Sequence, residues 1–334
     1  AMPVTIYDVA RQAGVSIATV SRVLRRSAPV QDETRQRVED AVDALGFVPS
    51  RLGVSLAERR HAANGVVFPD LSGPYFAEVV LGYEEVTSRL GRSVLILSTR
   101  EQADAEATVR ELASRVDGLA VFDGTVGEDT VHASVAGGLP VVRLARRDVD
   151  GADAVAAENL ASAERLTEHL LGHGHRRLAF LGDPGHSSDV AERYAGVCAV
   201  LERHGLTPAE PVRCASSEAS AKAAATALLE SPDRPDAIVC GNDERALATL
   251  LAAEDLGLRV PGDVAVTGWD DILAARHARP ALTTVRQPMR ELGAWAARAL
   301  DERIRGDRDT PATHLLPTRL IVRSSCGHHQ KEER

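Results

Sequence analysis

The chain has 334 residues, a net charge of −9 and a composition that is 44% hydrophobic but only 3% aromatic. A chain of this length can bury a large core and is too long for one small domain. It contains no run of 18 apolar residues that would indicate a membrane span. The first residues lack the pattern of a signal peptide, and four scattered cysteines without C-x-x-C spacing favour a reducing compartment. The predicted location is therefore cytoplasmic, at the nucleoid if the chain binds DNA.

Charge is distributed unevenly along the chain. Residues 1–60 hold nine arginines against seven Asp or Glu, a net charge of +2, whereas the remaining residues carry 30 basic against 41 acidic side chains. A basic head on an acidic body is typical of a DNA-contacting module attached to a part that does not touch DNA. Random surface variation is the alternative, and charge alone leaves it open.

The first 50 residues predict three short helices. Apolar residues at helical spacing indicate a helix over 6–13, with Thr5 as N-cap and Gly14 as the stop. Ser16 is a good N-cap for a second helix that continues to Leu24, and a third helix is predicted over 32–45. Two helices joined by a glycine turn within 20 residues form the helix-turn-helix pattern.

The outward positions of the second helix have side chains suited to a DNA groove. Arg22 can donate two hydrogen bonds to guanine, while Ile17 and Ala18 can pack on thymine methyl groups. Hydroxyl side chains suited to phosphate oxygens are Ser16, Thr19, Ser21 and Thr34. The alternative is a small helical protein-interaction domain with a solvated arginine.

From residue 64 onward, short β-branched runs alternate with helical patterns, among them 76–90, 160–173 and 245–256. This alternation predicts a doubly wound α/β body, and its length suits two similar lobes. The predicted buried parallel strands are 65–68, 93–97, 118–122, 140–144, 177–182, 237–240 and 264–268.

Polar side chains follow three of these strands at their carboxyl ends, where ligands bind in open α/β sheets. They are Asp70, Asn242, Asp243, Asp270 and Asp271, with Trp269 beside the last two. Carboxylates and amides suit sugar hydroxyls, and a ring such as that of Trp269 can stack on a sugar face. For Asp243 and Asp271 the favoured interpretation is capping of the helices that follow.

The chain contains VTIYDVARQAGVSIATVSRVLRR and TRQRVEDAVDALGFVPSRLGVSLA, and further along HLLGHGHRRLAFLGDP and IVCGNDERALATLLAAEDLGLRVPGDVAVTGWDD. These segments resemble the lactose/galactose repressor (LacI/GalR) family over nearly the whole chain. The resemblance implies a helix-turn-helix headpiece plus a periplasmic-binding-protein-like α/β body of two Rossmann-like lobes. The implied domains are a headpiece over 3–49, a hinge over 50–61, an effector and dimerisation domain over 62–327 (lobe 1 about 62–158 and 287–316, lobe 2 about 159–286 and 317–327) and a disordered tail over 328–334.

In the headpiece and hinge, the family pattern implies specific DNA contacts. The matching residues are Thr5, Ser16, Ile17, Ala18, Thr19, Ser21, Arg22, Arg25, Thr34, Phe47, Leu56 and Ala57. Arg25 stands where the family usually has Asn, so an operator sequence does not transfer. In the family the hinge becomes helical only over DNA, where a leucine, here Leu56, wedges into the minor groove. Gly53 costs this helix roughly 1 kcal/mol relative to Ala, and a linker that never folds is the alternative.

For the body, the family pattern implies an effector, most often a carbohydrate, between the lobes. Asp270, Asn242 and Arg193 match effector contacts best. Further matching positions are Asp70, Leu71, Tyr75, Asp189, Gln287 and Met289, and Trp269 joins them as an effector candidate on the strength of its ring alone. The family commonly has Asp where this chain has Ala145, followed by Arg146. The loss of that carboxylate among arginines suggests the hypothesis that the effector is an acidic or phosphorylated sugar.

The remaining signals indicate no catalysis. His169, His173 and His175 are interpreted as structural, no metal or other cofactor is expected, and no nucleophile-and-base or phosphate-loop motif occurs. The sequence therefore predicts a non-enzymatic transcription regulator, most simply a repressor. The chain lacks the leucine-heptad helix that makes the lactose repressor tetrameric, so a homodimer is expected. The dimer would bind a palindromic DNA operator under the control of a small molecule. The alternatives are a periplasmic-type solute-binding protein and an α/β enzyme with an appended DNA-binding module.

Overall fold

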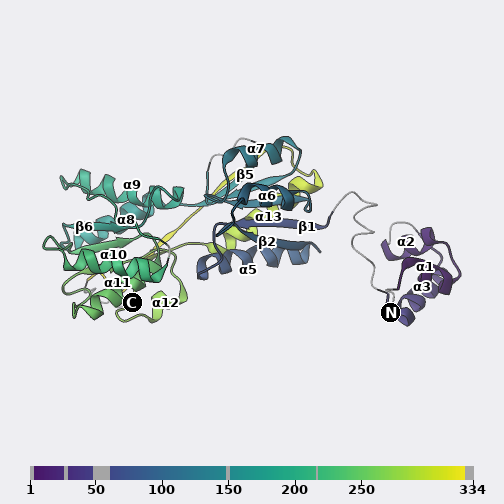
Figure 1. Ribbon diagram of the computed structural model, residues 1–334, viewed down its shortest axis with the longest axis horizontal. Helices are drawn as coiled ribbons and strands as arrows, with labels where there is room; N and C mark the ends of the chain where they lie inside the picture. The colour runs from purple at the N-terminus through teal and green to yellow at the C-terminus, as the bar shows by residue number, and fades with distance from the viewer. Residues whose placement is uncertain (1–3, 26–28, 48–60, 148–150, 216, 328–334) are drawn as a thin grey trace, which may run out of the picture. The chain divides into compact units, whose positions relative to one another are not determined.

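The computed structural model describes residues 4–25, 29–47, 61–147, 151–215 and 217–327. The chain forms two compact units that divide after Ala62: a headpiece of helices and a larger α/β body (Figure 1). The hinge residues Leu56 and Ala57 and the predicted tail over 328–334 lie outside the described residues.

The headpiece contains the three predicted helices, α1 (Ile6–Ala13), α2 (Ile17–Arg25) and α3 (Asp32–Leu45). Its N-terminal cap forms as expected, because the Thr5 amide and hydroxyl donate to the Asp8 carboxylate at 2.9 and 2.7 Å. Gly14 and Gly46 end α1 and α3 with φ values of +66° and +60°, a left-handed conformation in which glycine has no steric penalty. The helices enclose a small core that includes Val9, Val20, Val23, Val38 and Phe47.

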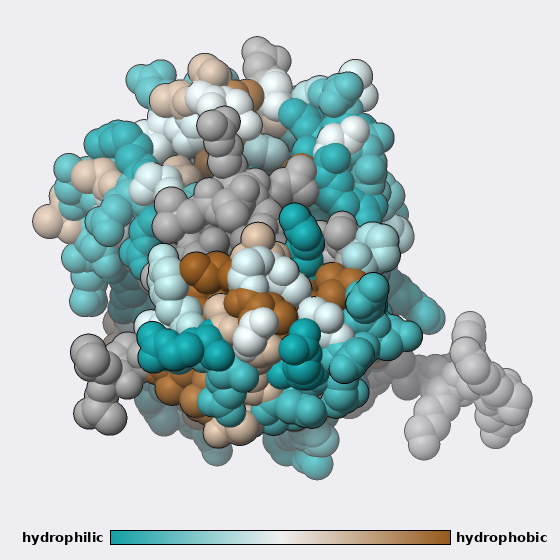
Figure 2. Space-filling model, turned by 90° about the vertical axis from the view of Figure 1, so that its right-hand side faces the viewer, coloured by the Kyte–Doolittle hydropathy of each residue, from teal (hydrophilic) through white to brown (hydrophobic). Residues whose placement is uncertain are grey.

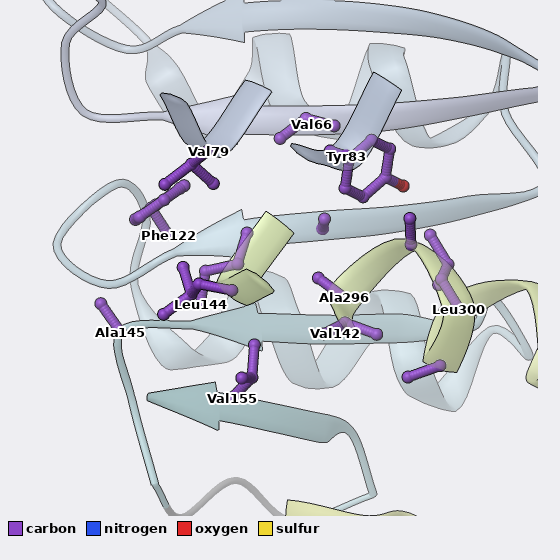
Figure 3. Close-up of a cluster of buried hydrophobic side chains, with 14 of the residues drawn as sticks. Val66, Val79, Tyr83, Phe122, Val142, Leu144, Ala145, Val155, Ala296 and Leu300 are labelled. Carbon is purple, nitrogen blue, oxygen red and sulfur yellow. The ribbon is translucent and has the colours of Figure 1, made fainter. Parts of the chain in front are cut away.

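The first lobe of the body is a six-stranded parallel sheet in the order β10-β5-β4-β3-β1-β2. Its strands are β1 (Ala63–Phe68), β2 (Ser93–Ser98), β3 (Gly118–Phe122), β4 (Val141–Leu144), β5 (Asp153–Ala157) and β10 (Thr313–Leu316). Helices α5 (Pro74–Arg89) and α13 (Met289–Arg305) cover one face, and α6 (Ala105–Ala113) and α7 (Glu128–Ala136) cover the other. Figure 3 shows the first of these cores, where Tyr83 and Leu300 approach the strands that carry Val66 and Val142.

Helices α5 and α13 pack unusually closely because a glycine lies on each contact face. A Cβ built on Gly82 would lie 2.0 Å from the Arg290 carbonyl oxygen, and one built on Gly293 would lie 2.0 Å from that of Val79. Since α13 follows a crossover from the second lobe, this contact fixes the returning chain against the first lobe.

The second lobe is built on the parallel sheet β6-β7-β8 and a short antiparallel pair, β9 with β11. Its strands are β6 (Leu178–Leu181), β7 (Ala237–Cys240), β8 (Ala265–Thr267), β9 (Thr284–Arg286) and β11 (Arg319–Ile321). Helices α8 (Leu160–Gly172) and α9 (Ser188–Arg203) pack on one face, and α10 (Glu218–Glu230) and α11 (Asp243–Asp255) pack on the other, near the short α12 (Leu273–His277).

The chain passes between the lobes three times: from β5 to α8, from β9 to α13 and from β10 to β11. The carboxyl ends of β4, β5, β6, β7 and β8 therefore lie near these crossovers, where both lobes can contribute side chains to one site.

The predicted α/β class is confirmed, but two features of the strands differ from the sequence expectation. Four strands were missed, because β5 is mostly alanine and β9, β10 and β11 have only three or four residues. The run 93–97 was predicted to be buried, yet β2 is only partly buried because it lies at the edge of its sheet. Across the described residues, no helix has both the length and the apolarity to cross a bilayer. The face drawn in Figure 2 carries separate apolar areas among hydrophilic residues.

Candidate functional site

The exposed side of α2 is the candidate DNA-reading surface. Val20 and Val23 are buried, whereas Ile17 is 40% exposed and Ala18 and Arg22 are also exposed. Within the described headpiece, Arg11 and Arg35 form ion pairs with Asp8 and Asp32, and no carboxylate lies within 4 Å of the Arg22 guanidinium. Arg22 is therefore available to an external acceptor.

The side chains of the other predicted DNA contacts differ in solvent exposure and in the hydrogen bonds that they already form. Ser16 Oγ accepts from the Thr19 amide at 3.2 Å and so acts as the expected N-cap. Thr5 is exposed, while Thr19, Ser21 and Thr34 are half-buried. Arg25 ends α2, and only its backbone is described. The side chain of Phe47 packs into the core and is 9% exposed. Only the main chain of Phe47 can therefore contact a phosphate.

In the body, Arg193 organises the ends of several elements at the cleft between the lobes. This guanidinium on α9 is buried and donates to Asn159 Oδ1 at 2.8 Å and to the Gly241 carbonyl at 2.6 Å. It lies 4.7 Å from the ring centroid of Trp269 and 3.7 Å from Asp189 Oδ2. The structure thus brings together Arg193, Asp189 and Trp269, three of the predicted effector residues.

Asn159 is a member of this network that the sequence did not reveal. It lies at the first crossover, accepts from Arg193, and donates to Asp189 Oδ1 at 2.9 Å. Its position after the missed strand β5 is the only signal that would have singled it out, because polar residues at carboxyl strand ends are ligand candidates.

A second pair of buried polar groups lies at the next crossover. Gln287 Nε2 donates to Asp270 Oδ1 at 2.6 Å, and Asp270 holds a φ of +114°. Burial raises the pKa of the Asp270 carboxyl to about 7 and that of Asp189 to about 6, although Arg193 acts in the opposite direction on both. Burial, together with the nearby Asp189 and Asp270 charges, also raises the pKa of Tyr75 on α5.

Three of the predicted effector residues carry buried polar atoms that no described group satisfies. They are Tyr75 Oη, Trp269 Nε1 and Gln287 Oε1. An unsatisfied buried polar atom costs free energy, so such atoms need a functional explanation. Two donors and an acceptor near paired carboxylates can bind a polyhydroxylated molecule.

The ring of Trp269 is covered by protein groups in this structure. Its side chain is 1% exposed, and the Arg193 guanidinium lies over the ring. In this structure its free Nε1, rather than a stacking face, is the group that remains for a ligand.

Two predicted helix caps are wrong. Asn242 Oδ1 accepts from the Arg245 amide at 3.1 Å and caps α11, whereas the buried Asp243 carboxylate accepts from Thr284 Oγ1 at 2.6 Å and the Ile272 amide at 2.9 Å. Asp271 forms ion pairs instead, with its carboxylate 2.6 Å from Arg323 and 2.7 Å from Arg286. Both acids are buried, so they bond to groups on other elements instead of capping the helix that follows each of them in the sequence.

The remaining predicted effector residues lie in the first lobe. Asp70 accepts from Ser72 and pairs with Arg100 at 2.6 Å, Leu71 is exposed, and Met289 begins α13 half-buried. Arg146 lies 3.1 Å from both Asp123 and Glu128. The buried Arg143 pairs with the same two carboxylates, so the two arginines and two acids form a balanced cluster and Arg146 is not a free cationic site.

The histidines near residue 170 connect the C-terminal segment to α8. His169 Nε2 lies 3.4 Å from Cys326 Sγ, and His175 Nε2 lies 3.0 Å from the Cys326 carbonyl oxygen. Across the described ranges, no group of three or more His, Cys, Asp or Glu is arranged to hold a metal ion.

Comparison with known proteins agrees with both units. Residues 5–50 match the model of bacterial regulatory proteins of the lacI family, and residues 167–326 match a periplasmic binding protein-like domain. Catabolite control protein A of Priestia megaterium is 32% identical over 97% of this chain and 99% of its own length, and the HTH-type transcriptional regulator DegA of Bacillus subtilis is 31% identical over 98% and 99%.

Solved structures give the same result. The lac repressor dimer bound to operator and the anti-inducer ONPF superposes with a TM-score of 0.87 at 29% identity, covering 98% of this chain and 100% of that one. The transcriptional regulator CelR in complex with cellobiose has a TM-score of 0.72 at 31% identity, covering 96% and 99%.

A helix-turn-helix headpiece joined to a two-lobed periplasmic-binding-protein-like body defines a DNA-binding transcription regulator, not an enzyme. The chain belongs to the lacI family of bacterial regulatory proteins. The predicted fold class and regulatory function are confirmed, and the two alternatives, a solute-binding protein and an enzyme, are set aside.

Proposed function

We propose that this regulator is a cytoplasmic, nucleoid-associated repressor that binds a palindromic operator as a homodimer and responds to a carbohydrate held between its lobes. The proposal for the headpiece rests on the exposed Ile17, Ala18 and Arg22 of α2. Two such helices related by a two-fold axis recognise two half-sites of a palindrome. The lac repressor, solved as a dimer on its operator, provides the precedent.

The observation that carries the effector proposal is the set of unsatisfied buried atoms around Asp270. Tyr75 Oη and Trp269 Nε1 can donate, and Gln287 Oε1 can accept. Asp189, Arg193 and Asp270 add charged groups whose hydrogen bonds are stronger than neutral ones. A sugar presents closely spaced hydroxyls that both donate and accept, so it can satisfy all of these groups at once. The similar regulator CelR, which was solved in complex with cellobiose, supports a carbohydrate as the effector class.

A phosphorylated or acidic sugar has weaker support from the geometry. Arg146 is paired with Asp123 and Glu128, and Arg147 with Glu192 at 3.0 Å. A phosphate would have to displace these carboxylates, which costs the ion pairs that they form. A neutral carbohydrate requires no such exchange.

The two sites communicate through the three crossovers and the hinge. An effector that contacts Gln287 and Asn159 contacts two of the crossover segments directly, so it can change the angle between the lobes. Such a change would bring together or separate the two hinge segments of the dimer and so alter operator affinity. Whether the effector releases or promotes DNA binding follows from which lobe angle it stabilises.

Selection from random double-stranded DNA at physiological salt tests the DNA half of the proposal. Sequencing of the DNA bound by the purified protein should give a palindrome with a flexible central step. A parallel screen of neutral sugars, sugar acids and sugar phosphates by thermal shift tests the effector half. An enriched sequence without two-fold symmetry would contradict the homodimer, and a screen without any stabilising carbohydrate would contradict the effector class.

A further inference from the structure

Helix α9 in the second lobe begins without a cap from its own segment. Ser187 occupies the N-cap position, but among the described residues its side chain bonds to no amide of the first turn. The first amides of a helix have no partner within the helix and need an acceptor from elsewhere. The first lobe supplies such an acceptor, because the Ser188 amide donates to Asp123 Oδ2 at 3.2 Å.

Asp123 makes more than this one bond to α9. Ser188 Oγ lies 2.7 Å from Asp123 Oδ2 and 3.0 Å from the Ala145 carbonyl oxygen, so one hydroxyl contacts the ends of both β3 and β4. Burial acts to raise the pKa of the Asp123 carboxyl, but hydrogen bonds from Ser188 and Arg146 lower it below its ordinary value. The group at the start of α9 is therefore a carboxylate, whose negative charge the helix dipole favours.

Helix α5 in the first lobe has the complementary arrangement. Its N-cap residue is Gly73, which has no side chain to bond to the first amides. The Glu244 carboxylate, from the first turn of α11 in the second lobe, lies against this residue, because a Cβ built on Gly73 would be 2.7 Å from Oε1 and 2.8 Å from Oε2. Each lobe therefore places a carboxylate at the amino end of a helix in the other lobe.

An ion pair between the lobes lies beside the first of these contacts. Arg147, which follows β4, pairs with Glu192 of α9 at 3.0 Å. Their side chains are 36% and 32% exposed, and ion pairs that water reaches contribute little. The two carboxylates at the helix starts are therefore the contacts that depend most on the angle between the lobes.

We propose that Asp123 and Glu244 form a reciprocal latch, in which each lobe caps a helix of the other and the lobes are held together before any effector binds. Opening of the cleft uncaps α9 and α5 at the same time, since each carboxylate moves away with its own lobe. Ser187 is a good N-cap residue and can then cap α9, whereas Gly73 offers α5 no substitute. An effector of any chemical class shifts an equilibrium that these caps already set. The latch goes beyond the proposed effector and does not depend on it.

The test is hydrogen exchange of the full-length, effector-free protein, measured by mass spectrometry in peptides that cover the first turns of α9 and α5. Asp123→Ala should speed exchange at the start of α9 about fivefold, the usual effect of removing a helix cap. It should also speed exchange at the start of α5, because loss of one cap favours opening and so removes the other. Glu244→Ala should likewise speed exchange at both helix starts. Ser188→Ala leaves the arginines around Asp123 untouched and should give a smaller change of the same kind, so the test does not depend on the folding of Asp123→Ala.

Glu128→Ala is the matched control for Asp123→Ala. Glu128 pairs with the same Arg143 and Arg146, at 3.4 and 3.1 Å, and its contacts among the described residues lie within the first lobe. This variant should leave exchange at both helix starts unchanged.

Faster exchange only at the helix that loses its own cap would overturn the latch, since the caps would then act locally. Equal effects of Asp123→Ala and Glu128→Ala, or unchanged exchange in Asp123→Ala and Glu244→Ala, would overturn it as well. The carbohydrate effector is tested separately by the thermal-shift screen, so its failure and that of the latch are distinguishable.

Discussion

Gln287 Nε2 donates to Asp270 Oδ1 at 2.6 Å. Gln287 lies in the crossover between β9 and α13, and Asp270 lies three residues after the end of β8. Both side chains are at least 95% buried, and Gln287 is followed within two residues by α13, which packs on the first lobe. A group that bonds to Asp270 therefore acts directly on a segment that connects the lobes. This bond would give the proposed effector site a physical route to the angle between the lobes.

Arg193→Lys should abolish or strongly weaken effector binding without unfolding the body. Lysine keeps the charge but lacks the planar fork that donates to Asn159 and Gly241 at once. Since hydrogen bonds to charged groups contribute about 1.5–3 kcal/mol, affinity should fall at least about tenfold. Calorimetry with a sugar found in the screen measures this loss.

Arg203→Lys is the matched control for that variant. Arg203 lies on the same helix but is half-exposed and pairs with Glu164 and Glu168 on the surface. Its replacement should leave effector affinity unchanged, since surface ion pairs contribute little. Equal affinity losses in the two variants would show that Arg193 acts through general destabilisation and not through the effector.

The stability of the body should fall as the pH rises from about 4 to about 7. The pKa of Asp270 is raised from 3.8 to about 7, so the folded protein holds a proton that the unfolded chain has already released. A group of this kind penalises folding fully above its folded pKa and not at all below its unfolded pKa. Asp189, with its pKa raised to about 6, acts in the same direction.

Asp270→Asn should therefore make the free energy of unfolding, measured by urea denaturation, depend less on pH between pH 4 and 7. Asp263→Asn is the control, because hydrogen bonds from the side chain and the backbone amide of Arg259 lower the Asp263 pKa to about 2 and confine its effect to more acidic pH. An Asp270→Asn protein with the same slope as the parent would mean that folding does not raise the pKa of Asp270.

Arg22→Ala should relax preference at one base pair of each half-site and cost about 1–3 kcal/mol in binding the selected operator. The exposed Arg22 guanidinium has no carboxylate within 4 Å among the described residues, so it is available for a guanine edge. Arg37→Ala removes the same charge from the exposed surface of α3 and should leave base preference unchanged. A loss that is uniform over all sequences in Arg22→Ala would make Arg22 a phosphate contact instead.

Gly82→Ala should destabilise the body because the added methyl group would meet the Arg290 carbonyl oxygen at 2.0 Å. Overpacking of this kind costs about 1–3 kcal/mol, and more where backbone must move. Gly172→Ala at the end of α8 is the control: no described atom lies within 4 Å of its added Cβ, so its effect should stay within about 0.5 kcal/mol. Urea denaturation of both variants measures the difference, and equal stabilities would show that α5 and α13 can separate without cost.

Much of the secondary structure could be predicted from the sequence because it depends on neighbours along the chain. Thr5 bonds to Asp8 three residues away, and Gly14 needs only its own backbone freedom to end α1. Contiguous apolar runs such as 118–122 and 237–240 predict strands for the same reason. The family resemblance added the predicted bounds of the two lobes and the predicted effector residues.

The tertiary structure decided which polar groups meet. Asn159 bonds to Arg193 over 34 residues of sequence and Ser188 to Asp123 over 65, so no local spacing could indicate either contact. The same reason explains the wrong caps, because Asp243 is buried beside β9 and satisfies its carboxylate there. Buried polar groups must find partners wherever packing places them. The sequence by itself therefore determined the headpiece helices, most of the strands and the class of the protein, whereas only the packing of the lobes decided which polar groups meet at the crossovers.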